Sequence, residues 1–186
     1  ESEFKSIQQD VSRGVQVLDN LLLLARLDPE QKESLVKTKF DFSLLMQDVI
    51  KALQPFAESK QIEVQMVLAK EVYVFANEQL LFSALRNVLD NAIRYSPEQA
   101  KVFVTLTIER QQLRLRIENS GHGVEAAVIQ RLGERFYRAL GTKTQGSGLG
   151  LSICQKIVDL HAGQLLFISS DLGGLKVELL LNRVEA

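Results

Sequence analysis

Two runs of alternating apolar residues, separated by a short polar turn, constrain this chain more than any other feature. The turn from Glu109 to Gln112 divides the runs, whose apolar members are Val102, Val104, Leu106, Ile108, Leu113, Leu115 and Ile117. A period of two is typical of strands with one buried face, and the short turn makes the pair an antiparallel hairpin. The buried face of such a hairpin needs a covering layer, which helices elsewhere in the chain would supply.

Helical patterns and further strand patterns alternate irregularly along the rest of the chain. The predicted helices span residues 42–53, 77–95, 124–132 and 149–160. The other predicted strands span residues 62–68, 72–75, 165–168 and 175–181. In the helix that starts at residue 42, Asp41 or Ser43 is the predicted cap and Leu44 belongs to the apolar face, while Met66 belongs to the inward face of its strand. This order predicts an α+β fold, a two-layer α/β sandwich with helices over one face of a mixed, mostly antiparallel sheet.

Residues 1–28 form a predicted helix of a different kind. Its apolar positions are spaced alternately three and four apart, which is typical of the seam of a helical bundle or coiled coil. No later segment repeats this seam, so the helix packs against another copy, against sequence missing upstream, or against its own domain. Proline at position 29 ends the helix, and the polar, lysine-rich residues 29–40 are predicted to be a linker. Residues 41–186 then form the main domain.

Composition excludes several classes of function. The chain has 22 Lys plus Arg against 23 Asp plus Glu, a net charge of -1, which is too little to attract nucleic acid or an anionic membrane as a whole. One cysteine excludes an internal disulfide framework and a cysteine-based zinc cluster. The apolar stretch from Leu21 to Ala25 is far shorter than the roughly 20 residues that span a bilayer. The chain begins with Glu1 rather than Met, so we expect a piece of a longer protein and membrane contact only through segments outside it.

A glycine-rich segment opens the predicted helix 149–160. It reads Gly146-Ser147-Gly148-Leu149-Gly150. Glycines let the backbone approach a ligand closely, and the free amides at a helix start attract anions, so the segment predicts a phosphate cradle. It is not a Walker loop, because Ser147 stands where that motif has a lysine. A structural connector before a helix is the alternative.

A polar stripe interrupts the otherwise apolar helix 77–95. Asn87, Asn91 and Arg94 are spaced i, i+4 and i+7 and therefore share one face. Side-chain amide oxygens suit Mg²⁺, which prefers oxygen ligands and shares its shell with water and phosphates, and Arg94 suits a phosphate. An exposed polar stripe without a ligand is the alternative.

Two further segments carry candidate chemistry. Asn119 offers a hydrogen-bonding side chain beside Gly121 and Gly123, where the backbone leaves room for a flat base, although a hairpin exit explains the glycines almost as well. A basic and aromatic cluster follows, made up of Arg131, Arg135, Phe136, Tyr137, Arg138 and Lys143. It supplies the local positive field that the net charge lacks, either as a loop that closes over a polyphosphate or as a solvated loop.

In this order the four segments resemble the N, G1, F and G2 boxes of the ATP-binding domain of two-component sensor histidine kinases. The strings that carry the resemblance are Asn-Val-Leu-Asp-Asn-Ala-Ile-Arg-Tyr-Ser-Pro, Glu-Arg-Phe-Tyr-Arg and Gly-Ser-Gly-Leu-Gly-Leu-Ser-Ile. Gyrase, Hsp90 and MutL ATPases share this superfamily, and Gly173-Gly174 is similar to its G3 box. Residues 1–28 resemble the second helix of the dimerisation and phosphotransfer domain of class I, membrane-bound members.

The resemblance implies a site for ATP and Mg²⁺. Asn87 and Asn91 would coordinate Mg²⁺ between the phosphates, and Asp90 would either assist catalysis or make a structural helix contact. Arg138, with Lys143, would reach the γ-phosphate. The other residues at the nucleotide would be Arg94, Tyr95, Asn119, Gly121, Gly123, Phe136, Gly146, Gly148, Leu149 and Gly150.

Asn119 departs from the family pattern. The family usually has an aspartate there, which accepts a hydrogen bond from the adenine amino group. An asparagine oxygen also accepts, but without the charge, so we expect a bond weaker by about 1 kcal/mol or less.

The resemblance further implies a kinase rather than an ATPase. Related ATPases have a glutamate general base four residues before the Mg²⁺-binding asparagine, whereas this chain has Asn87, which cannot take a proton. The expected reaction is transfer of the γ-phosphoryl group to a histidine for relay to a response regulator. Neither His122 nor His161 fits the family's acceptor motif, so we expect the acceptor outside this sequence.

The resemblance also implies a homodimer in the full-length protein, with this chain in the cytoplasmic region of a bacterial inner-membrane sensor. Two alternatives stay open. One is a degenerate ATP-binding or dimerisation module without kinase activity, and the other is an ATPase of the same superfamily.

Overall fold

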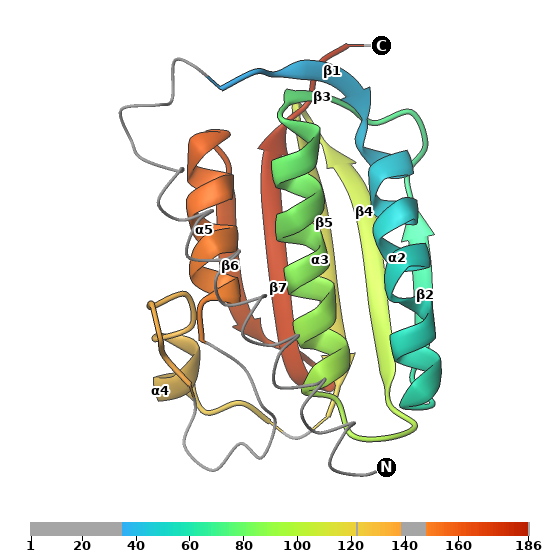
Figure 1. Cartoon of the computed structure of the whole chain (residues 1–186), viewed down its shortest axis with the longest axis vertical. Helices are drawn as coiled ribbons and strands as arrows, with labels where there is room; N and C mark the ends of the chain where they lie inside the picture. The colour runs from blue at the N-terminus through green and yellow to red at the C-terminus, as the bar shows by residue number, and fades with distance from the viewer. Residues whose placement is uncertain (1–34, 122, 139–147, 186) are drawn as a thin grey trace, which may run out of the picture.

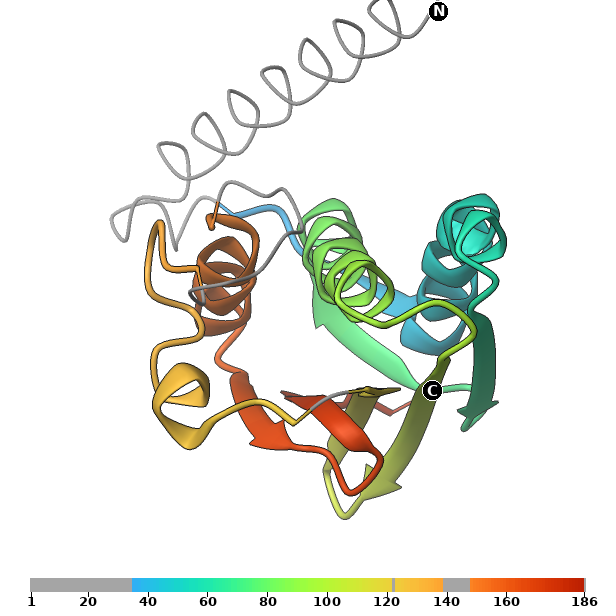
Figure 2. The same cartoon turned by 90° about the horizontal axis from the view of Figure 1, so that it is seen from below.

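The computed structural model describes residues 35–121, 123–138 and 148–185, which form two layers (Figures 1 and 2). Three long helices lie side by side over one face of a sheet, and a short helix lies at the sheet edge. The helices are α2 (Phe42–Ser59), α3 (Glu78–Arg94), α4 (Ala126–Ile129) and α5 (Gly150–Leu160). The predicted α+β sandwich is therefore confirmed.

The main sheet has five strands and mixed direction. Across the sheet the order is β2 (Glu63–Leu68), β4 (Lys101–Glu109), β5 (Gln112–Ser120), β7 (Gly173–Asn182) and β6 (Gln164–Ser169). Only the β2–β4 pair is parallel, which confirms the prediction of a mostly antiparallel sheet. A separate antiparallel pair, β1 (Thr38–Asp41) and β3 (Tyr73–Ala76), lies at the end of the helical layer (Figure 1).

Alternation in the β4–β5 hairpin fills the core as predicted except at Ile108, which is 38% exposed near the hairpin turn. Val104 lies opposite Ile117, and Leu106 opposite Leu115, and all four side chains are fully buried against the helices. On the helical side, α3 supplies the matching apolar stripe, whose buried members are Leu81, Ala84, Leu85, Val88, Leu89 and Ile93. The polar stripe of α3 is left on the opposite, outer side.

Helix α2 runs beyond its predicted end at Leu53 and includes Pro55. A proline this close to the C-terminus removes one hydrogen bond, and the following turn still buries Ala57 completely. The prediction for Leu44 is wrong, since its side chain is 58% exposed and Phe42 and Met46 occupy the inward face instead.

Two other predictions are corrected by the structure. Residues 38–40 belong to β1 rather than to a linker: Phe40 pairs with Val74, and the Lys39 ammonium lies 5.1 Å from the Tyr73 ring centre. Met66, predicted to face the core, is 54% exposed on β2, one of the two edge strands of the sheet.

The helix predicted at 124–132 shortens to α4, after which the chain continues in turns. The predictions for residues 1–28, His122, Lys143 and Gly146 fall outside the described residues. Within the described ranges, no helix combines the length and the apolar composition that crossing a bilayer requires.

Candidate functional site

The glycine-rich segment and the asparagine stripe, predicted separately, meet at the start of α5. A Cβ atom placed on Gly150 would lie 3.9 Å from Oδ1 of Asn87 and 4.0 Å from Nδ2 of Asn91. Only a glycine's hydrogens therefore stand between the helix start and the two amides. Packing of α3 against α5 creates this neighbourhood, because the two helices lie side by side, α3 over β5 and α5 over β6.

The N-terminus of α5 is suited to an anion. Its N-cap, Leu149, offers no side-chain cap, and the hydroxyl of Ser152 donates to the Leu149 carbonyl at 2.8 Å rather than covering the amides. Leu149 is fully buried, which anchors the loop to the core. The positive end of the helix therefore lies beside the asparagine stripe without a side-chain cap.

The polar stripe of α3 divides into two parts. Arg94 donates to Asp90 through Nε and Nη2, both at 3.0 Å, and its guanidinium lies 5.2 Å from the Phe56 ring centre. Asn87 and Asn91 are half-buried, and within the described part of the chain their side chains make no hydrogen bond. The two asparagines are thus the members of the stripe that are available to a ligand.

The donor types fit Mg²⁺ better than a softer metal. No group of three or more His, Cys, Asp or Glu side chains in the described ranges could hold a metal ion. Asn87 and Asn91 instead offer neutral amide oxygens next to an anion-binding helix start. Mg²⁺ binds through few protein oxygens when phosphates and water complete its shell, so these residues fit the predicted ion.

Asn119 lies in a hydrogen-bond network and is only 5% exposed. Its Oδ1 accepts from the Leu175 N–H at 3.0 Å, and its Nδ2 donates to Ser96 Oγ at 3.0 Å. The Ser96 hydroxyl donates in turn to the Ala92 carbonyl at 2.6 Å. These partners fix the orientation of the Asn119 amide, because in the reversed orientation its NH₂ group would face the Leu175 N–H, which is also a donor.

Glycines surround Asn119 closely. A Cβ on Gly174 would clash with the Asn119 carbonyl oxygen, and one on Gly121 would lie 3.4 Å from Asn119 Nδ2 and from Pro97 Cδ. No side chain fits at Gly174, which explains why the second residue of β7 is a glycine. Tyr95, which is the C-cap of α3 and precedes Ser96 in the sequence, is exposed.

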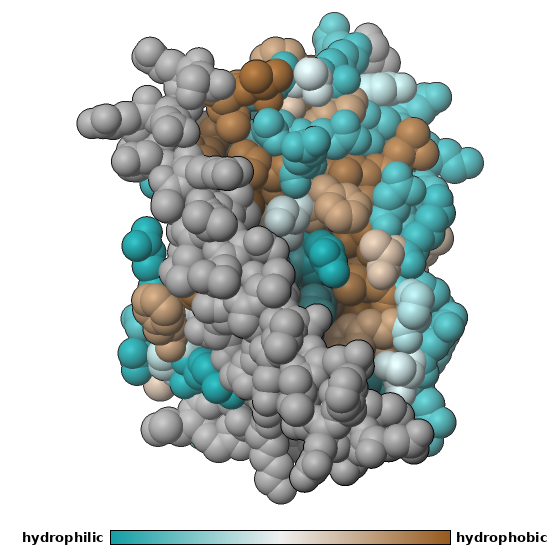
Figure 3. Space-filling model, in the orientation of Figure 1, coloured by the Kyte–Doolittle hydropathy of each residue, from teal (hydrophilic) through white to brown (hydrophobic). Residues whose placement is uncertain are grey.

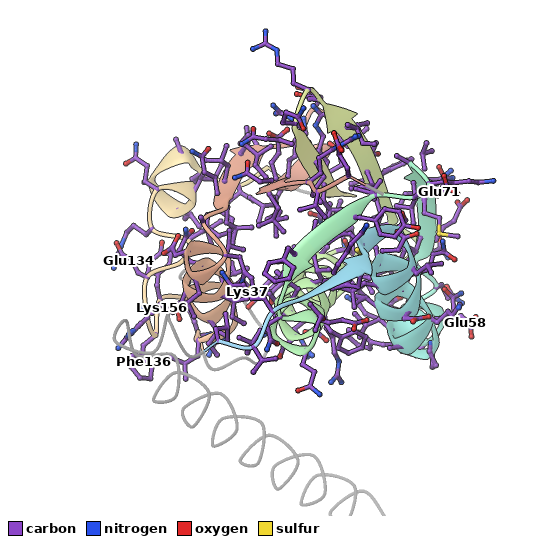
Figure 4. All side chains as sticks on the ribbon, turned by 90° about the horizontal axis from the view of Figure 1, so that it is seen from above. Lys37, Glu58, Glu71, Glu134, Phe136 and Lys156 are labelled. Atoms are coloured by element: carbon purple, nitrogen blue, oxygen red, sulfur yellow. The ribbon has the colours of Figure 1, made fainter. Side chains whose placement is uncertain are left out.

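Phe136 and Gly148 connect the predicted lid to the phosphate loop. The Phe136 N–H donates to the Gly148 carbonyl at 3.0 Å. Phe136 has a φ of +62°, which is unusual for a phenylalanine, and the residue is 66% exposed at the outer edge of the molecule beside α5 (Figure 4). Gly148 has a φ of +71°, and a Cβ there would lie 2.8 Å from the Phe136 carbonyl carbon.

The predicted basic cluster is less free than its composition indicates. Arg131 donates to Glu134 at 2.9 Å and lies 4.1 Å from the Tyr137 ring centre. Its charge is therefore offset locally. The side chains of Arg135 and Arg138 also lie at the surface. Gly123, the other predicted glycine of the base segment, is exposed and faces open space except for the Gly173 carbonyl, 3.9 Å from a Cβ placed on it.

Lys60 and Ser96 join the site without having been predicted. The Lys60 ammonium donates to three carbonyls at the end of α3, and burial, followed by the charge of Arg94, lowers the pKa of Lys60. Its neighbours in sequence carry no motif, and its partners lie 33 to 36 residues away, so only the fold brings them together.

Seen from the helical side, a broad apolar area extends along α2 and α3 (Figure 3).

Comparison with known proteins agrees with this geometry. Residues 76–185 match the family model described as histidine kinase-, DNA gyrase B-, and HSP90-like ATPase. The sensor protein QseC of Escherichia coli K12 is 35% identical over 173 residues, which cover 92% of this chain and 37% of QseC. The chain thus spans a little over a third of that relative.

Solved structures share the fold. The mycobacterial sensor histidine kinase MprB has a TM-score of 0.72 and 26% identity, over 81% of this chain and all of the MprB chain. Histidine kinase ThkA, solved in complex with the response regulator protein TrrA, has a TM-score of 0.78 and 20% identity, over 99% of this chain and 51% of the ThkA chain. The proteins named above are a sensor protein and two histidine kinases, and this chain belongs to the histidine kinase-, DNA gyrase B- and HSP90-like ATPase family.

Proposed function

We propose that this chain is the catalytic, ATP-binding part of a sensor histidine kinase and transfers the γ-phosphoryl group of Mg·ATP to a histidine outside this sequence. The observation that carries the proposal is the approach of Gly150 to Asn87 and Asn91. It joins a helix start without a side-chain cap, suited to phosphates, to two amides suited to Mg²⁺. Family membership and the sensor kinase relatives support ATP as the nucleotide.

In this proposal the triphosphate lies between α5 and the α3 stripe. Backbone amides of the loop at Gly148 and Gly150 would bind phosphate oxygens, and Asn87 and Asn91 would hold Mg²⁺. When bound, Mg²⁺ neutralises charge on the phosphates and orients them. The loop backbone contributes fixed dipoles, which need no reorganisation during transfer.

The base would lie on the side of Asn119. Asn119 Oδ1 has a second lone pair beyond the one used by the Leu175 N–H, and that lone pair would accept from the adenine amino group. Gly123 faces open space that the ring would use, the absence of a side chain at Gly121 would let the ring approach Asn119, and the exposed Tyr95 would contact the nucleotide. A neutral oxygen that is already engaged makes this contact weaker than a carboxylate would.

The proposed lid would extend along the chain from Phe136 to the glycine-rich loop. Phe136 would anchor its base through the hydrogen bond to Gly148, and Arg138 would reach the γ-phosphate. The roles of Lys143 and Gly146 in this lid rest on their sequence resemblance alone. Arg94 would act mainly through its pair with Asp90, at the border of the phosphate region.

The chain offers no general base where the related ATPases have one. Asn87 cannot accept a proton, and the Asp90 carboxylate is held by two hydrogen bonds from Arg94. That pair favours a structural role for Asp90 over a catalytic one. Water activation is therefore weak, which keeps the γ-phosphoryl group for the histidine.

The surrounding protein enters the same proposal. Residues 1–28 would be the second helix of a dimerisation and phosphotransfer bundle, with the nucleotide domain after it. The full-length protein would be a homodimeric inner-membrane sensor with this part in the cytoplasm, and a response regulator would receive the phosphoryl group. A response regulator complex among its structural neighbours supports that partner.

The proposal is tested by supplying a separate helical hairpin that carries the acceptor histidine. With Mg²⁺ and γ-labelled ATP, we expect acid-labile label on the hairpin and none on this chain alone. Steady phosphate release without labelled hairpin would instead identify an ATPase. Absence of binding to a fluorescent ATP analogue at millimolar concentration would identify a degenerate module.

A further inference from the structure

Lys60, at the C-cap of α2, reaches across to the end of α3. Its Nζ donates to the carbonyl oxygens of Ile93 at 2.9 Å, Arg94 at 2.9 Å and Ser96 at 2.8 Å. An ammonium group has three protons, so this arrangement uses all of them. A surface lysine with three backbone partners from one segment is fixed in place rather than freely solvated.

The end of α3 needs such a partner. The last carbonyl oxygens of a helix accept no hydrogen bond from the helix itself, and they carry the negative end of the helix dipole. Helix α3 ends at Tyr95 rather than at a glycine, and its own last-turn cation, Arg94, is bonded to Asp90. Lys60 therefore supplies, from another helix, the cation that this terminus lacks.

Ser96 connects this terminus to the base side of the site. Its carbonyl accepts from Lys60, and its hydroxyl accepts from Nδ2 of Asn119 while donating to the Ala92 carbonyl. Ser96 is 4% exposed, so water does not replace these partners easily. A shift of the Ser96 backbone would move the hydroxyl that fixes the Asn119 amide.

We propose that Lys60 is a positioning residue for the base-binding side of the nucleotide site, acting through Ser96 on the amide of Asn119. The inference rests on the proposed function, which assigns the base contact to Asn119. It separates two halves of the site. In the described part of the chain, the hydrogen bonds of the Lys60 ammonium go to the end of α3 and not to the phosphate half, which consists of the start of α5 with Asn87 and Asn91.

The test compares Lys60→Met with Lys51→Met. Lys51 is an exposed lysine of the same helix, paired with Asp48 at 3.2 Å, and it serves as the matched control. For each variant, Mg·ATP and magnesium triphosphate, which has no base, compete with a fluorescent ATP analogue. We expect Lys60→Met to weaken ATP on the order of fivefold, the scale of one net hydrogen bond, and to change the triphosphate less than twofold.

A purely structural role for Lys60 predicts a different result. If Lys60 only joins α2 to α3, its loss lowers the free energy of unfolding but weakens ATP and triphosphate equally, or weakens neither. Either pattern overturns the inference. Lys51→Met should leave both affinities unchanged, and a selective loss of ATP in this control would overturn it as well.

Ser96→Ala tests the connection directly and does not require Lys60→Met to fold. This variant keeps the carbonyl that Lys60 binds and removes the hydroxyl that Asn119 binds. We expect the same selective loss of ATP, and in the double variant a loss no greater than the larger single one. Fully additive losses would show that Lys60 does not act through Ser96. If the unaltered chain binds triphosphate but not ATP, or binds neither, the proposed function fails first and the inference with it.

Discussion

Nε2 of His161 accepts a hydrogen bond from the backbone N–H of Asn77 at 3.0 Å. Nδ1 of the same ring lies 2.7 Å from the Ile157 carbonyl oxygen and therefore carries the ring proton. The imidazole joins the C-terminus of α5 to the N-cap of α3, whose side chain accepts from the Leu80 N–H. Only the neutral ring makes both bonds.

We expect this contact to make stability depend on pH. Burial, more than the nearby charge of Lys37, lowers the pKa of His161 below its usual 6.5, although the bond to Ile157 opposes the shift. Above that value the ring is neutral in both the folded and the unfolded chain. As the pH falls below 6.5, the unfolded chain binds a proton that the folded chain resists, so the free energy of unfolding decreases.

Urea unfolding at pH 7.5 and pH 5.5 measures the effect. His161→Gln cannot titrate, so we expect it to lose less stability than the unaltered chain over this interval, while carboxylates common to both cancel in the comparison. Equal losses in the two proteins would contradict the prediction.

Gly150→Ala should separate folding from nucleotide binding. A Cβ there meets nothing closer than 3.9 Å, and alanine favours a helix over glycine, so the free energy of unfolding should stay equal or rise by up to about 1 kcal/mol. The added methyl group would occupy space between the helix start and Asn87, where phosphate is expected. We therefore predict a roughly tenfold loss of ATP affinity, measured by fluorescence titration.

Gly163→Ala is the matched control for that change. Its Cβ would lie 2.5 Å from Leu181 Cδ2 and 2.6 Å from the Leu180 carbonyl oxygen, so this variant should lose stability, far from the proposed phosphates. Unchanged ATP affinity in Gly150→Ala would contradict an anion-binding role for the start of α5.

Asn119→Asp should strengthen ATP binding. The carboxylate retains an acceptor for the Leu175 N–H, and its charge strengthens the expected bond from the adenine amino group. Ser96, whose hydroxyl now donates to Ala92, would donate to the new carboxylate instead. We predict a gain of up to about 1 kcal/mol, or roughly fivefold, by titration with Mg·ATP. Weaker binding by Asn119→Asp would argue against a base contact at this position.

Much of the fold could be predicted because its signals are local. The alternation around Val104 and Ile117 specifies both a hairpin and its buried face, and the structure pairs these two residues. Helix α3 begins at the cap Asn77 and ends just before Ser96-Pro97, as predicted. Such signals depend on a few neighbouring residues and survive without knowledge of the fold.

The predictions of secondary structure were wrong where tertiary packing, rather than local sequence, determines the structure. Burial of Ala57 carries α2 past Pro55, and pairing with β3 makes a strand of residues 38–40, whose composition resembles a linker. In the candidate site, the spacing of Asn87 and Asn91 predicted one shared face correctly. Their approach to Gly150 and the bond from Lys60 to Ser96 depend on how helices pack, which no short pattern encodes.

Asn91→Ala should uncouple ATP binding from Mg²⁺. The Asn91 side chain makes no hydrogen bond in the described part of the chain, so its removal leaves no protein group unpaired and should change the free energy of unfolding little. Loss of an amide oxygen should weaken ATP in the presence of Mg²⁺ by on the order of tenfold and should leave the Mg²⁺-free affinity unchanged. Asp90→Asn is the control beside it, because Asp90 is held by Arg94 and should affect stability more than the Mg²⁺ dependence. Titrations of both variants with and without Mg²⁺ measure the difference, and a Mg²⁺ dependence preserved in Asn91→Ala but lost in Asp90→Asn would transfer the metal role to the carboxylate.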